Sequence, residues 1–253
     1  MRPLLTFDEP IPPAPLAPRR LTEELLVVLA LSLLASAVFS VIDLLTAPVS
    51  GVTVASVSQD VLLARQLASF VFGLAPVWLV VFLVRRNDEG IGAIGLAWDR
   101  ARFDLVLGVL LAVAIGACGV GFYLLAVELG VNRFVVPAPP LGHWWTVPVL
   151  IANAAEAALL EEVIVAGYLI TRLQQLRVPT LGAIAMSALL RGSYHLYQGW
   201  GGFLGNLAMG LALGWVFARW RRTWPLVIAH FLLDVGAGIG WIVFRDRLPG
   251  FGG

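Results

Sequence analysis

The stretch NAAEAALLEEVIVAGY, residues 153–168, places three carboxylates in an otherwise apolar segment of helical length: Glu156, Glu161 and Glu162. Ionisable side chains at membrane depth are costly, so they tend to face the interior of a helix bundle and to mark a functional site. We therefore expect the rest of the chain to be organised around this helix.

Two segments further along the chain carry the natural partners of these carboxylates. Arg191 and His195 lie in ALLRGSYHLY, residues 188–197, and His230 and Asp234 lie in VIAHFLLDV, residues 227–235. His230 and Asp234 are four positions apart, so on a helix they share a face and the carboxylate can orient the imidazole. The pattern predicts that the three segments form one site inside the membrane.

The composition indicates an all-α polytopic membrane protein. Of the 253 residues, 59% are hydrophobic and 13% are charged, whereas an ordinary soluble domain is about 25% charged. We expect a multi-pass protein of a bacterial cell membrane, in contact with lipid. The net charge is +1 and the arginines are scattered, so nucleic acid is not an expected partner.

The distribution of apolar residues predicts about seven membrane spans, each of which needs about 20 residues. They are expected near residues 25–42, 61–84, 105–127, 145–170, 179–197, 199–218 and 223–244. Residues 1–20 are expected to be a disordered cytoplasmic tail, residues 21–130 a scaffold of spans one to three, and residues 143–245 the core that carries the site. Residues 90–102 read as a short interfacial segment.

The positions of the arginines predict which side of the membrane each loop occupies, because cytoplasmic loops are enriched in arginine and lysine. With a cytoplasmic N-terminus, the outer loops hold only Arg133, Arg245 and Arg247. The cytoplasmic set is Arg2, Arg19, Arg20, Arg85, Arg86, Arg100, Arg102, Arg172, Arg177, Arg219, Arg221 and Arg222. This asymmetry places the N-terminus in the cytoplasm and the C-terminus outside.

The geometry of a helical hairpin predicts which polar residues meet. If the fourth and fifth helices turn near Val178, positions whose numbers add up to about 356 lie level, so Glu161 is level with His195. Counted from the membrane edge, Glu161 lies about 16 Å deep, Asp234 about 15 Å and His230 about 9 Å. The similar depths favour a shared site over separate packing roles.

The same residues resemble the signature of the CPBP family of intramembrane proteases, which includes CAAX prenyl protease-like, Abi and bacteriocin-processing proteins. That signature is E-E-x-x-x-R, then F-x-x-x-H, then H-x-x-x-N or H-x-x-x-D. Here it stands as EEVIVA, residues 161–166, RGSYH, residues 191–195, and HFLLD, residues 230–234. The resemblance covers roughly residues 145–244.

Two positions depart from the family pattern. Ala166 stands where the family has arginine, and Arg191 stands where it has phenylalanine. Position 166 is level with position 190 in the predicted hairpin. We therefore hypothesise that Arg191 supplies the missing guanidinium from the opposite helix and neutralises Glu162.

The resemblance implies an endopeptidase that hydrolyses a peptide bond of a membrane-associated or apolar peptide. It suggests Glu161 as the general base on water, assisted by His195, with His230 at the substrate carbonyl and Asp234 orienting His230. Glu162 would lie behind them, paired with Arg191. Whether Glu161, His195 and His230 instead hold one divalent metal ion such as zinc stays open, since two histidines and a glutamate are a known zinc ligand set.

Two other classes of function are consistent with the same residues. A catalytically inactive membrane scaffold or immunity protein is favoured by the two departures from the family pattern, although such a protein has little reason to bear the desolvation cost of the polar cluster. A proton-coupled transporter could also use these side chains, but the sequence has no internal repeat of the kind that many transporters show. The oligomeric state is left open.

Overall fold

The computed structural model describes residues 11–33, 36–38, 41, 59–131 and 141–244, and every element in them is a helix. The α-helices are α1 Pro18–Ala30, α3 Gln59–Gly73, α4 Ala75–Arg86, α5 Ala101–Glu128, α6 Thr146–Glu161, α7 Leu169–Gln175, α8 Thr180–Tyr194, α9 Trp200–Trp220 and α10 Trp224–Phe244. The others are the 3-10 helices η1 Ile91–Ile94 and η3 Leu196–Gln198 and the π-helix η2 Glu162–Tyr168.

Four helical stretches in the described residues are long and apolar enough to cross a membrane. They are Gln59–Arg86, Ala101–Ala126, Trp200–Trp220 and Trp224–Phe244, and they correspond to the predicted spans two, three, six and seven. Large apolar side chains such as Phe72, Trp78 and Val113 are exposed on the first two, as expected of surfaces that face lipid. The all-helical, multi-pass character is confirmed, while the total of seven spans and the cytoplasmic N-terminus stay predictions.

The ends of several helices differ from those predicted. The first helix begins at Pro18, a position in the first turn where proline is well tolerated. The chain before it is held by a 3.1 Å hydrogen bond from Gln175 to the carbonyl of Pro13. The second span is two helices that meet at Leu74, two residues before Pro76. The loop after the first span and the PAPP stretch at 137–140 lie outside the described residues.

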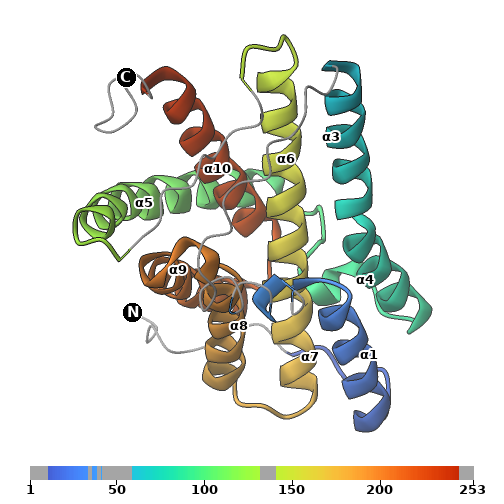
Figure 1. Ribbon diagram of the computed structural model, residues 1–253. Coiled ribbons are helices and arrows are strands. Elements are labelled where there is room, and N and C mark those ends of the chain that lie inside the picture. Colours follow the sequence, from blue (N-terminus) through green and yellow to red (C-terminus); the bar gives the residue numbers. More distant parts are fainter. Residues whose placement is uncertain (1–10, 34–35, 39–40, 42–58, 132–140, 245–253) are drawn as a thin grey trace.

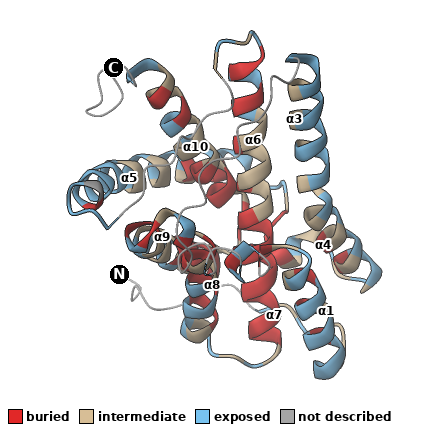
Figure 2. Cartoon of the chain, viewed as in Figure 1, coloured by how far each residue is buried: buried red, intermediate tan, exposed pale blue. Residues whose placement is uncertain are grey.

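The continuous run α6, η2 and α7 forms the axis of the bundle (Figure 1). Helices α3 and α4 lie along one side of this axis with α1 near its α7 end, and α10, α5, α8 and α9 lie on the other side. Helix α8 packs on α9, and α10 packs on both α5 and α6. Buried residues concentrate where η2 and α7 meet their neighbours (Figure 2), so the core surrounds the end of the carboxylate-bearing stretch.

The predicted interfacial segment, residues 90–102, includes the start of α5 at Ala101, and the part before α5 is fixed to the junction between α9 and α10. Thr223 donates its amide to the carbonyl of Gly95 at 2.9 Å and its hydroxyl to the carbonyl of Ile94 at 2.6 Å. The indole of Trp224 donates to the carbonyl of Leu96 at 3.2 Å. These bonds set the start of α10, the helix that carries His230.

We predict that Gly167→Ala destabilises the protein, because Gly167 of η2 lies directly against this junction. A Cβ atom there would lie 2.7 Å from the carbonyl oxygen of Ile94 and 2.8 Å from the hydroxyl of Thr223. Overpacking of this kind costs about 1–3 kcal/mol, which should appear as a lower apparent Tm in detergent. Gly119→Ala is the matched control, since a Cβ there meets nothing within 4 Å, and an equal Tm for the two variants would contradict the prediction.

Candidate active site

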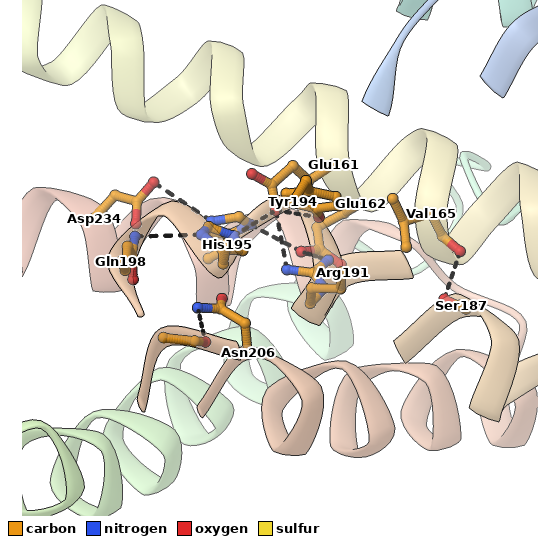
Figure 3. A network of polar contacts seen from close by, with 12 residues as sticks. Glu161, Glu162, Val165, Ser187, Arg191, Tyr194, His195, Gln198, Asn206 and Asp234 are labelled. Atoms are coloured by element: carbon orange, nitrogen blue, oxygen red, sulfur yellow. Dashed lines mark hydrogen bonds and ion pairs between the residues drawn. The ribbon is translucent and has the colours of Figure 1, made fainter. Parts of the chain in front are cut away.

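The two adjacent carboxylates lie where an α-helix becomes a π-helix. Helix α6 ends at Glu161, and η2 begins at Glu162. Wider π-helical turns are rare and occur frequently at functional sites. The carbonyl of Val165 within η2 accepts a 2.7 Å hydrogen bond from the hydroxyl of Ser187 in α8 (Figure 3). This bond ties the widened segment to the helix that carries the next polar residues.

Arg191 of α8 lies between the two carboxylates. Its Nη1 is 3.2 Å from Oε2 of Glu161, and its Nη2 is 2.5 Å from Oε1 of Glu162. The side chains of Arg191 and Glu162 are 1% and 0% exposed, so each charge is stabilised mainly by its neighbours, because water does not reach it. The hypothesis from the sequence paired Arg191 with Glu162, and the structure adds a contact with Glu161.

Glu161 also faces two aromatic side chains from the end of α8. The hydroxyl of Tyr194 donates to Oε2 of Glu161 at 2.7 Å, and Nε2 of His195 lies 3.9 Å from the same oxygen. On the other side of the imidazole, Nδ1 of His195 is 3.3 Å from Nε2 of the Gln198 side chain. Within the described residues Nε2 of His195 has no hydrogen-bonding partner, so this nitrogen can serve a reactant beside Glu161.

His230 of α10 lies between Glu162 and a third carboxylate, Asp234. Its Nδ1 is 2.8 Å from Oε1 of Glu162, and its Nε2 is 3.4 Å from Oδ2 of Asp234. The neighbourhood of His230 and Asp234 follows from their spacing of four residues. The closer contact with Glu162 does not, and it joins α10 to the same carboxylate that Arg191 contacts.

The side chains of the cluster differ in exposure. Glu161 and His195 are 12% and 15% exposed and Asp234 is 41% exposed, whereas Glu162 and Arg191 are fully buried. Figure 3 shows His195 between Asp234 on one side and Glu161, Glu162 and Arg191 on the other. Glu156 is outside this arrangement, next to Gly73 of α3.

The three residues that could hold a metal do not present a free set of donors. Both ring nitrogens of His230 face carboxylates, and Oε2 of Glu161 faces Tyr194 and Arg191. In the part of the chain that the structure describes, no group of three or more His, Cys, Asp or Glu side chains is placed to hold a metal ion. His230 therefore has no free ring nitrogen, and the arrangement does not fit a zinc site made of Glu161, His195 and His230.

Three contributors to the cluster were not predicted from the sequence: Tyr194, Gln198 and Ser187. The hairpin rule could have found Tyr194, because position 194 is level with position 162 when numbers add up to about 356. Gln198 lies in η3, beyond the end of α8 at Tyr194, and it falls between the predicted spans 179–197 and 199–218. Ser187 donates to the carbonyl of Val165 within η2, and a π-helix was not predicted from the sequence.

Comparison with known proteins agrees with the resemblance noted in the sequence. Residues 143–236 match the family described as Type II CAAX prenyl endopeptidase Rce1-like. The match includes Glu161, Glu162, Arg191, His195 and His230, together with Asp234. A search of curated proteins and a search of solved structures returned no match.

Proposed function

We propose, from the premise that residues 143–236 form a domain of the type II CAAX prenyl endopeptidase family, that the protein is an intramembrane endopeptidase. It hydrolyses a peptide bond of a membrane-associated or apolar peptide. The observation that carries the proposal is the pairing of a reachable carboxylate, Glu161, with a ring nitrogen of His195 that has no other hydrogen-bonding partner in the described residues.

The proposed reaction begins with a water molecule between Glu161 and His195. Glu161 accepts a proton from the water as the oxygen attacks the carbonyl carbon of the substrate, and His195 holds the water in place. The C–N bond then breaks, and the proton passes from Glu161 to the leaving amine. A carboxylate that first accepts and then returns the proton balances the reaction, because no net proton stays on the enzyme.

His230 is assigned to the developing negative charge on the substrate oxygen. Hydrogen-bond donors that point at such an oxyanion in a site with little water usually provide a large part of the transition-state stabilisation. Nδ1 of His230 contacts Glu162 at 2.8 Å, whereas Nε2 is 3.4 Å from Asp234, so Nε2 is the nitrogen assigned to the substrate oxygen. Arg191 lies between Glu161 and Glu162 and offsets the repulsion between the two adjacent carboxylates.

The test is cleavage of a library of membrane peptides by the purified protein in detergent, followed by mass spectrometry. Glu161→Gln removes the base with little change in shape, and we expect it to slow cleavage by about 10²–10⁴-fold, the usual contribution of general acid–base catalysis. Glu156→Gln is the matched control on the same helix and should cleave at the wild-type rate. His195→Asn should be impaired like Glu161→Gln.

The other outcomes separate the competing functions. Wild-type cleavage that a chelator abolishes would replace the proposed water activation by a metal-assisted one. No cleavage by wild type, with proton flux in vesicles that Glu161→Gln abolishes, would indicate a transporter. Neither activity would favour the inactive scaffold or immunity protein.

A further inference from the structure

Three side chains lie against the same oxygen of Glu161. The hydroxyl of Tyr194, Nη1 of Arg191 and Nε2 of His195 all face Oε2, at 2.7, 3.2 and 3.9 Å. Of these, the hydroxyl of Tyr194 is the closest. A hydrogen bond to an ionised carboxylate is shorter and stronger than one between neutral groups, so this contact is well suited to fixing the direction of the carboxylate.

Tyr194 is itself held firmly. It is the last residue of α8 and is 3% exposed, so its ring is surrounded by protein. The ring also lies beside the imidazole of His195, with centroids 4.8 Å apart and planes tilted by 44°. One rigid side chain thus touches both members of the proposed catalytic pair, through its hydroxyl on one side and its ring face on the other.

We infer that Tyr194 is a positioning residue: by holding Oε2 of Glu161 it fixes the direction of the carboxylate toward the water beside His195. The inference rests on the proposed function, since it concerns the alignment of Glu161 with that water. Tyr194 does not take part in bond making: its hydroxyl faces Glu161 and is buried with it. Without that hydroxyl, Glu161 can rotate, and the reactive oxygen loses its alignment with the water.

The decisive variant is Tyr194→Phe, which removes the hydroxyl and keeps the ring against His195. We expect kcat to fall by about tenfold to a hundredfold with KM unchanged within about twofold, because substrate contacts are kept while alignment is lost. The apparent Tm should stay near that of wild type. Tyr197→Phe is the matched control: Gln198 donates to its hydroxyl at 3.0 Å, and its kcat should not change.

A kcat for Tyr194→Phe equal to that of wild type overturns the inference. So does an equal loss in Tyr197→Phe, or a loss of kcat that follows a large fall in Tm, because either would indicate a general structural role. Tyr194→Leu adds a second check: it removes the ring as well and should be slower than Tyr194→Phe.

An infrared measurement separates failure of this inference from failure of the proposed function. The carboxylate stretch of Glu161 is assigned from the difference between wild type and Glu161→Gln, and Tyr194→Phe should shift that band, because a strong donor has been removed. Absence of cleavage by wild type overturns the proposed function, and with it the catalytic role of Tyr194, even where the band shifts. An unchanged band overturns the contact itself, whatever the activity.

Discussion

Replacing Arg191 with methionine is expected to abolish cleavage and to lower the stability of the fold by about 3–5 kcal/mol, the cost of leaving a buried charge without its partner. Methionine keeps much of the length and the apolar volume of arginine, so the loss of cleavage and of stability would be due to the missing charge. Glu161 and Glu162 would then lie side by side in the core with no guanidinium between them. The apparent Tm in detergent and the cleavage rate measure the two effects.

Two further variants test how Arg191 acts. Arg191→Lys should recover part of the stability and little of the activity, because one ammonium group cannot match the two directions of a guanidinium fork. Restoring the family pattern with Ala166→Arg and Arg191→Phe together should retain activity that Arg191→Phe alone loses. If both of these were equally inactive, the hypothesis that the arginine has moved from one helix to the other would be wrong.

The second large effect is expected at Arg222, which is not part of the candidate site. Arg222 donates from Nε and Nη2 to the buried carboxylate of Asp104 at the start of α5, from Nη1 to Asp99 at 2.7 Å and from Nη2 to the carbonyl of Ala97 at 2.8 Å. Arg222→Met would leave Asp104 buried and unpaired, at a cost of about 3–5 kcal/mol. The measurement is again the apparent Tm in detergent.

The control for Arg222 removes both charges. Arg222→Met combined with Asp104→Leu should be close to wild type in Tm, because a buried ion pair can be replaced by apolar side chains at little cost. Asp99→Asn should change little, since the side chain of Asp99 is 63% exposed and surface pairs contribute little. The hydrogen bond from Arg222 lowers the pKa of Asp99 below its ordinary value, and Arg222→Met should return it toward that value. A double variant as unstable as Arg222→Met would contradict this account.

Hydropathy was enough to predict the long helices of the fold. Long apolar runs predicted α5, α9 and α10, because the backbone of such a segment must form its hydrogen bonds within a helix when it lies in lipid. Helix ends were less predictable, since Pro76 breaks the second span at Leu74 without ending it and α8 stops at Tyr194. These ends depend on tertiary contacts that hydropathy does not register.

In the candidate site, the level of a residue along its helix was predictable, and the direction of its side chain was not. The hairpin rule placed Glu161 beside His195, and the two lie 3.9 Å apart. It could not assign His230 to Glu162, because the direction of a side chain depends on the phase of its helix and η2 changes that phase. The partner of each carboxylate therefore had to come from the three-dimensional structure.

The widened helix has a consequence for anyone who would transplant this chemistry. If the Glu161 and Glu162 pair is copied onto an ideal α-helix, Glu162 and the residues after it will point in different directions, because that helix lacks the broader turn of η2. The graft would have the correct sequence and the wrong side-chain geometry. A template for this site needs the irregular winding and a hydroxyl like that of Ser187 to occupy the carbonyl that the winding releases.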